Sequence, residues 1–198
     1  MPKLTLSQLP EFVRSGVISF PTDTVAAIST LPPQGQRLYE LKQRSPDKPL
    51  ILMGATAADL WPYVIGNEHE RATWTAVVEQ HWPGPLTLVL PASERLPKAM
   101  NPTGSGTIGI RVPDHPVARR VLAETGPLAT TSANRSGQPA LMQAAQIAAA
   151  FPTVGLLDSV IIRDLQAGQP LMPSGIASTV AKWTGNGWQI IRQGTIHL

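Results

Sequence analysis

Three cationic residues lie within seven positions, at Lys42, Arg44 and Lys48, and the apolar run 50–52 follows them directly. The preceding residues predict a helix, which should end before Pro46 because the residue before a proline is forced out of the α region. The cations then lie at a helix end and in a loop that opens onto a strand, where α/β proteins commonly bind ligands. Such a cluster suits a polyanion such as a phosphate chain. A solvated helix end, whose negative dipole pole attracts cations, is the alternative.

Polar side chains recur where other predicted strands end. These residues are Thr22, Asp23 and Thr24, then Thr107 and Arg111, then Thr130, Ser132 and Asn134, then Ser174 and Ser178, and finally Arg192. Turn chemistry can explain each group alone, because Ser, Thr and Asn are the residues that turns use. If the strands share one sheet, however, their ends can converge on one cleft. Hydroxyls, amides and several cations together predict a site for phosphates and a small polar substrate.

The common catalytic motifs are absent from the sequence. It has no GxxxxGK[ST] phosphate loop, no GxGxxG turn between a strand and a helix, and no GxSxG nucleophile elbow. Ser132 stands at a strand-to-loop junction, but no histidine is visibly paired with it, and the four histidines lack metal-ligand spacing. We therefore expect no protein nucleophile and no protein-held metal.

Composition limits the class of protein. The chain has 198 residues, of which 42% are hydrophobic and 15% charged, which is typical of a folded domain. A net charge of +3 does not by itself indicate nucleic-acid binding. No apolar run of about 18 residues predicts a membrane helix, and the N-terminus lacks the apolar core of a signal peptide. The absence of cysteine excludes disulfides and fits a cytoplasmic protein.

Periodicity predicts short helices that alternate with strands, as in a layered α/β fold. The predicted helices cover 4–14, 35–43, 57–63, the segment from Asn67 through His81, 116–125 and 142–150. The predicted strands cover 17–20, 25–28, 50–53, 86–90, 107–112, 127–131, 159–163, 176–182 and 187–192, with long loops at 92–106 and 164–175. The last two strands should form an antiparallel hairpin around Asn186-Gly187. No linker or repeat divides the chain, so residues 1–198 are expected to form a single domain.

Two motifs carry a family resemblance. Lys42-Gln43-Arg44, followed by Lys48-Pro49 and later by Ser132-Ala133-Asn134, resembles the signature of the YrdC-like threonylcarbamoyl-AMP synthases. Further blocks match in kind and order along nearly the whole chain: 20–25 (FPTDTV), 82–87 (WPGPLT), 109–116 (GIRVPDHP), 132–137 (SANRSG), 178–180 (STV) and 192–194 (RQG).

The resemblance implies a twisted sheet of mixed parallel and antiparallel strands, flanked by helices, over a basic concave cleft. It implies condensation of L-threonine, bicarbonate and ATP into threonylcarbamoyl-AMP and pyrophosphate, for the threonylcarbamoyl modification of adenosine 37 in tRNA. The positions expected to bind ATP are Arg44, Lys48, Thr107, Ser132, Asn134 and Arg192, with Lys42 in the same basic motif. Those expected to hold threonine are Thr22, Arg111, Thr130 and Ser178.

The implied reaction agrees with the absence of a nucleophile. Threonine's amine is carbamoylated, and a carbamate oxygen then attacks the α-phosphorus while pyrophosphate leaves. Both steps need alignment and charge neutralisation, which cations and a Mg²⁺ ion held mainly by the ATP phosphates can supply. The expected partners are the substrates and a downstream threonylcarbamoyl transferase, with tRNA as a further candidate.

Three positions depart from the family pattern. Ala26-Ala27 replaces the usual Tyr-Gly, Met53 stands where many relatives have a histidine, and Ala181-Lys182 replaces a hydrophobic–acidic pair. Because alanine lacks the ring and hydroxyl of tyrosine, we expect weaker selection of threonine over serine. An RNA-binding module, or a paralogue with weakened activity, is the alternative function.

Overall fold

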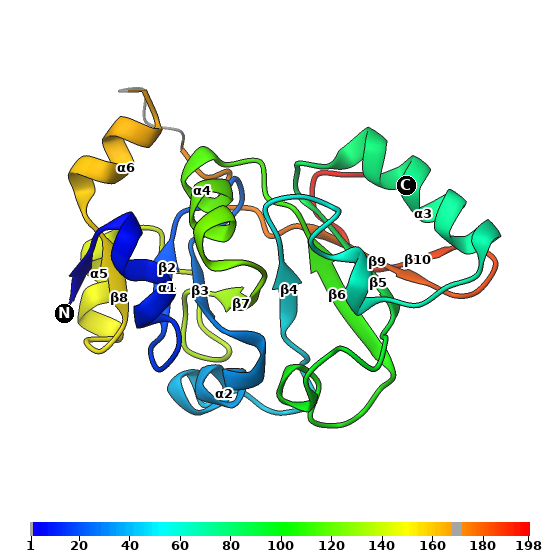
Figure 1. Cartoon of the computed structure of the whole chain (residues 1–198), viewed down its shortest axis with the longest axis horizontal. Coiled ribbons are helices and arrows are strands. Elements are labelled where there is room, and N and C mark those ends of the chain that lie inside the picture. The colour runs from blue at the N-terminus through cyan, green and yellow to red at the C-terminus, as the bar shows by residue number, and fades with distance from the viewer. Residues whose placement is uncertain (1, 168–171) are drawn as a thin grey trace.

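The computed structural model describes residues 2–167 and 172–198, whose strands form one ten-stranded sheet in the order β1-β8-β2-β3-β7-β4-β6-β5-β9-β10 (Figure 1). The strands are β1 (Lys3–Leu4), β2 (Ile18–Phe20), β3 (Ala27–Thr30), β4 (Ile51–Met53), β5 (Leu86–Pro91), β6 (Thr107–Arg111), β7 (Leu128–Ser132), β8 (Gly155–Leu157), β9 (Thr179–Trp183) and β10 (Trp188–Arg192). Parallel and antiparallel pairs both occur, so the expected mixed sheet is confirmed.

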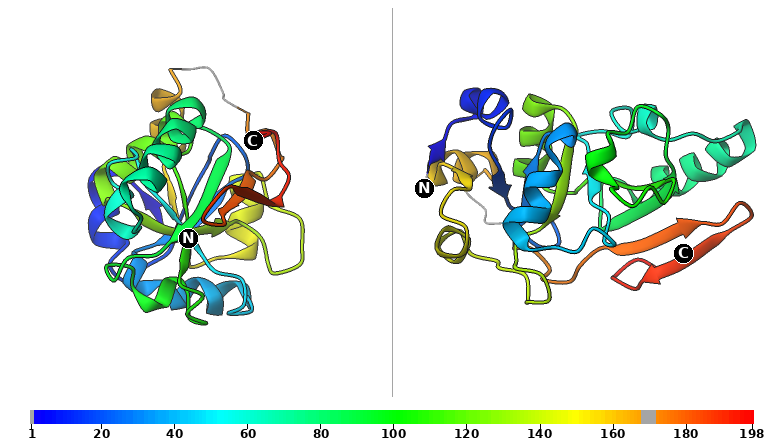
Figure 2. Two further views of the ribbon diagram at one scale, coloured as in Figure 1. Left: turned by 90° about the vertical axis from the view of Figure 1, so that its right-hand side faces the viewer. Right: turned by 90° about the horizontal axis from the view of Figure 1, so that it is seen from below.

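Helices cover both sides of the sheet. They are α1 (Leu9–Phe12), α2 (Gln36–Lys42), α3 (Glu68–His81), α4 (Pro116–Thr125), α5 (Ala144–Ala150) and α6 (Ser159–Leu165), with 3₁₀ turns at Leu6–Gln8, Pro32–Gln34, Trp61–Tyr63 and Lys98–Met100. Seen from below, α1 and α4 lie on one side of the sheet, and α5 lies toward the other (Figure 2). Within the described ranges, no helix has the length and apolarity that crossing a membrane requires.

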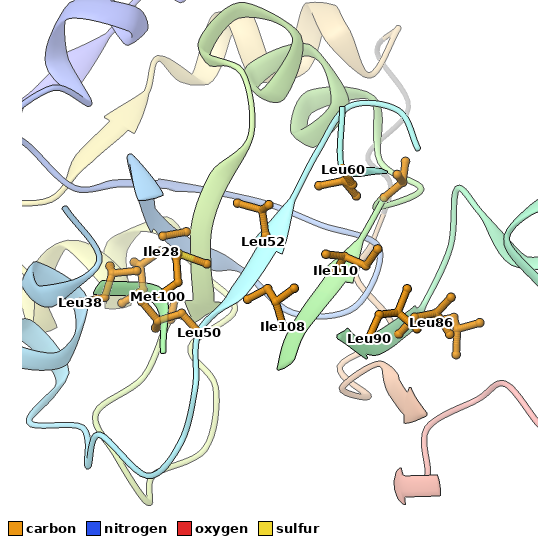
Figure 3. Packing of buried hydrophobic residues seen from close by; sticks show 14 of the residues in the cluster. Ile28, Leu38, Leu50, Leu52, Leu60, Leu86, Leu90, Met100, Ile108 and Ile110 are labelled. Atoms are coloured by element: carbon orange, nitrogen blue, oxygen red, sulfur yellow. The ribbon is translucent and has the colours of Figure 1, made fainter. Parts of the chain in front are cut away.

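Alternation along the central strands divides the core in two. Ile28, Leu52 and Ile110 belong to the larger cluster, part of which Figure 3 shows. Met53 and Leu128 belong to the second cluster, which packs against α1 and α4. Each such side chain stabilises the fold by about 1.5–3 kcal/mol when it is fully buried. The central strands are therefore a rigid base for the loops at their ends.

Several predicted elements agree closely with the structure. The helices α3 and α4 match the predicted bounds, with Asn67 accepting a hydrogen bond from the Glu70 N–H as N-cap and Pro116 in the first turn of α4. The strands β9 and β10 form the expected antiparallel hairpin.

The predicted strand at 159–163 is wrong, because these residues belong to helix α6 and the strand β8 precedes them. Asp158 caps the helix by accepting a hydrogen bond from the Val160 N–H. Ile161, Ile162 and Leu165 have helical spacing and pack against the second core cluster. The β-branched run was thus mistaken for a strand. Part of the predicted loop 164–175 lies outside the described residues.

Two predicted helices are also wrong in their extent. The segment 4–14 divides into β1, a 3₁₀ turn and the short α1, which begins anew with Pro10 in its first turn. The segment 57–63 is helical only as the 3₁₀ turn Trp61–Tyr63, in which Pro62 cannot donate a helical hydrogen bond. Helix α2 ends at Lys42, where Gln43 takes the left-handed conformation with φ of 52°, and so it ends well before Pro46.

Candidate functional site

A cavity of about 370 Å³ lies where the ends of the central strands meet two surface loops and the C-terminal hairpin. Most of the residues expected to bind ATP or threonine line it. These are Arg44, Arg111, Thr130, Ser132, Asn134, Ser178 and Arg192. The sequence therefore placed these side chains in one site, although their individual roles stay predictions.

Strand register explains one wall of the cavity. Thr130 on β7 pairs with Ile51 on β4, and Ser132 on β7 pairs with Ala27 on β3. Residues that pair directly point to the same face of a sheet, so these side chains form a continuous surface. The Thr130 hydroxyl is already within 2.8 Å of the buried Ser29 hydroxyl. The sheet thus fixes this wall before any ligand binds.

The 132–138 loop, defined as residues 132 to 138, begins at the last residue of β7 and is held in place by Lys42. Lys42 is buried, and its Nζ donates to the Asn134 Oδ1 at 3.0 Å, to the Thr131 Oγ1 at 3.3 Å and to the Ser132 carbonyl. Lys42 itself does not line the cavity. Burial, and then the nearby charge of Arg44, lower the pKa of Lys42 to about 7.

Arg44 reaches the cavity from the loop after α2. Its Nε donates to the Lys48 carbonyl at 2.8 Å and its Nη2 donates to the Pro49 carbonyl at 3.1 Å. These bonds hold the guanidinium in place, and desolvation lowers its pKa. The Lys48 side chain is exposed and does not line the cavity. The basic cluster is therefore separated: Lys42 lies inside the protein, Arg44 at the cavity and Lys48 outside.

Arg111 is buried at the opposite wall. Its Nη2 forms an ion pair with the Asp23 Oδ1 at 2.6 Å, its Nη1 donates to the Thr24 Oγ1 at 2.9 Å, and its Nε donates to the Gly84 carbonyl at 3.0 Å. Burial lowers the pKa of Arg111, and the Asp23 carboxylate opposes that effect. The guanidinium therefore ties β6 to the 23–24 turn while still facing the cavity.

Arg192 on β10 completes the group of arginines. Its Nε donates to the Ser178 carbonyl at 2.9 Å and its Nη2 donates to the Ser178 Oγ at 3.1 Å. The same Oγ is 2.8 Å from the Thr87 Oγ1. Partial desolvation lowers the pKa of Arg192. Arg44, Arg111 and Arg192 consequently face one small cavity from three different elements, which favours the binding of an anion with several charged groups.

Two other predicted residues do not line the cavity. Thr22 is buried and donates to the Val25 carbonyl at 2.7 Å, so it shapes the turn behind the wall. The Thr107 hydroxyl lies 3.1 Å from the Ser105 hydroxyl, away from the lining.

Some lining residues were not predicted. They include Val25, Gln138, Gly175 and Ala177. Thr24, which also lines the cavity, was among the strand-end polar residues expected to converge on one cleft, although no substrate was assigned to it. No sequence signal pointed to Gln138 or to the 175–177 segment. Of the positions that depart from the family pattern, Ala26, Ala27 and Met53 line the cavity, whereas Ala181 and Lys182 do not.

The described residues contain no group of three or more His, Cys, Asp or Glu side chains that could hold a metal ion. The cavity offers cations, hydroxyls and amides, which can bind and align charged groups but supply no evident nucleophile.

Comparisons with known proteins identify the family. The family model described as telomere recombination, which groups Sua5, YciO and YrdC, matches residues 12–194. The chain is 37% identical over 172 residues to a threonylcarbamoyl-AMP synthase of Chromohalobacter salexigens, covering 80% of this chain and 90% of that one. It is 34% identical over 186 residues to a protein of the same name from Stutzerimonas stutzeri, covering 85% and 97%.

Solved structures agree with this assignment. Sua5 of P. abyssi, crystallised with L-threonine, superposes with a TM-score of 0.81 at 28% identity over 96% of this chain. This chain spans only 54% of the Sua5 chain, about half its length. E. coli YciO superposes with a TM-score of 0.77 at 22% identity, covering 98% of this chain and 93% of that one, which supports the fold. The resemblance seen in the sequence is confirmed, and the chain belongs to the Sua5–YciO–YrdC family.

Proposed function

We propose that this protein is a threonylcarbamoyl-AMP synthase, which condenses L-threonine, bicarbonate and ATP into threonylcarbamoyl-AMP and pyrophosphate. The observation that carries the proposal is the cavity, where Arg44, Arg192 and Ser132 meet Arg111 and Thr130. The first group comprises positions expected to bind ATP and the second positions expected to bind threonine. A site for both substrates in one cavity is what a condensation requires. Relatives that are identical to this chain at more than a third of the aligned residues carry the synthase name.

The chemistry needs positioning and charge neutralisation from the protein. The threonine amine attacks the bicarbonate carbon, a C–N bond forms and water leaves, which gives the carbamate. A carbamate oxygen then attacks the α-phosphorus, and the bond from that phosphorus to the bridging oxygen breaks to release pyrophosphate. Negative charge builds on phosphate oxygens in this step, and fixed guanidinium groups such as Arg44 and Arg192 would stabilise it.

Mg²⁺ would enter with ATP as part of the substrate. Its ligands would be phosphate oxygens, in line with the oxygen-rich coordination that Mg²⁺ prefers. The product is activated for transfer, so a downstream threonylcarbamoyl transferase and tRNA are the partners that we propose, in the cytoplasm where tRNA is modified.

The test is release of pyrophosphate from Mg²⁺–ATP by the purified protein. Release should require both threonine and bicarbonate, and should fall by at least tenfold in Arg44→Ala. Arg95→Ala, which removes an exposed arginine outside the cavity, is the matched control. Pyrophosphate release at the same rate with and without threonine would contradict the proposal. No turnover, together with RNA binding that weakens steeply with salt, would favour an RNA-binding module instead.

A further inference from the structure

Lys42 is an unusual lysine because it is almost fully buried and has no counterion among the residues that the structure describes. Its exposed fraction is 1%, and no salt bridge in the described ranges includes it. Its three shortest hydrogen bonds go to neutral oxygens, on Thr131, Ser132 and Asn134. An ammonium has three N–H groups, so these bonds use all of them. Since an unpaired buried charge is costly, these bonds must offset the cost of desolvation.

Asn134 connects Lys42 to the rest of the 132–138 loop through hydrogen bonds. Its Oδ1 accepts from the Lys42 ammonium and from the Ser132 Oγ at 2.5 Å. Its Nδ2 donates to the Arg135 carbonyl at 2.9 Å and to the Gln138 carbonyl at 2.6 Å. The amide is thus saturated by bonds within the protein. Because Ser132, Asn134 and Gln138 line the cavity, the conformation of this loop determines part of its shape.

We propose that Lys42 is a positioning residue, which holds the 132–138 loop in its ligand-binding shape through Asn134 and does not itself touch the nucleotide. This inference rests on the proposed function in one respect, which is that ATP is the ligand of the cavity. It differs from direct phosphate contact, the role that clustering with Arg44 in the sequence suggests.

The anchoring should depend on pH. After burial, the charge of Arg44 just beyond α2 lowers the pKa of Lys42, and the other charged group of the loop, Arg135, has its guanidinium over the Phe151 ring at 5.8 Å. Deprotonation leaves Lys42 with two N–H groups for three acceptors, so the loop should loosen as pH rises above about 7. A bound polyanion favours the protonated form, so nucleotide binding should take up a proton above that pH.

The first experiment needs no ligand and measures hydrogen exchange of the 132–138 amides. At pH 6.5 we expect Lys42→Met to speed exchange in this loop by about tenfold relative to the wild type, and Lys98→Met, at an exposed lysine, to leave it unchanged. In the wild type, after correction for intrinsic rates, protection of the loop should fall between pH 6.5 and 8.5 while protection of β5 stays constant. This wild-type comparison still tests the idea if Lys42→Met fails to fold. Unchanged protection in both comparisons would overturn it.

The second experiment separates positioning from direct contact by ATP calorimetry. If Lys42 acts through Asn134, then Lys42→Met and Asn134→Ala should each weaken ATP binding by about tenfold, and the double variant should lose no more than about twofold beyond either. Direct contact predicts that the two losses multiply. At pH 8 the wild type should take up a proton on binding, measured in buffers of different ionisation enthalpy, and Lys42→Met should not. If the wild type does not bind ATP, the synthase proposal fails while the exchange result still decides the role of Lys42.

Discussion

Replacing Asp23 by alanine should destabilise the folded protein by about 3–5 kcal/mol, because it leaves the Arg111 charge buried without its counterion. The Arg111 side chain is 3% exposed and that of Asp23 14%, and their ion pair is only 2.6 Å long. The Thr24 hydroxyl and the Gly84 carbonyl remain as neutral acceptors, but neither compensates a full charge. For a chain of this size, the loss corresponds to a fall in melting temperature of roughly 6–20 °C.

The control is an ion pair of the same type on the surface. Glu11 and Arg14 are 3.7 Å apart with side chains that are 84% and 71% exposed, so Glu11→Ala should cost less than about 1 kcal/mol. Urea unfolding, followed by tryptophan fluorescence, measures both values. If Asp23→Ala costs no more than Glu11→Ala, the Arg111 charge is compensated in another way, and our account of this wall of the cavity is wrong.

Three further predictions concern the cavity and the residues around it. Arg44→Ala should weaken ATP binding by about 1.5–3 kcal/mol through loss of a charge-assisted hydrogen bond, and unchanged affinity in a folded variant would refute this. The stability of the wild type relative to Lys42→Met should rise by about 2.5 kcal/mol between pH 7.5 and 9.5 in urea unfolding. The sign follows because Lys42 releases its proton near pH 7 when folded but only near 10.5 when unfolded, so the unfolded state binds more protons in this window. Ala26→Tyr should increase the ratio of kcat/KM for threonine over serine, and an equal ratio in both proteins would show that Ala26 does not border the amino-acid site.

The sequence predicted the central strands well because their signals are local. The strands around Leu52, Ile110 and Leu128 are short apolar runs bounded by turn residues, and the polar residues that follow them could be expected at a common edge. The helix α6 was missed because Val160 and its isoleucine neighbours are β-branched. The hydrogen bond by which Asp158 caps this segment and favours a helix is seen only in the structure.

The separation of the basic cluster could not be predicted from spacing. Lys42 and Arg44 are two residues apart, and the left-handed turn at Gln43 sends one side chain inward and brings the other to the cavity. A lysine that binds a ligand and a lysine that anchors a loop have the same sequence signature. Only the burial of Lys42 and the identity of its hydrogen-bond partners distinguish them.

The position of Arg192 at the border of the sheet has a consequence for how ligand binding can be observed. Among the strands of residues 2–167 and 172–198, β10 is the last in the sheet and pairs only with β9, so it can open locally while the central strands stay intact. Each such opening would withdraw one cation from the cavity, and an anion bound to Arg192 would oppose it. Hydrogen exchange of the β10 amides therefore reports how much of the protein has an anion bound in the cavity. This exchange should slow as the ligand concentration rises, while exchange in β7 stays constant.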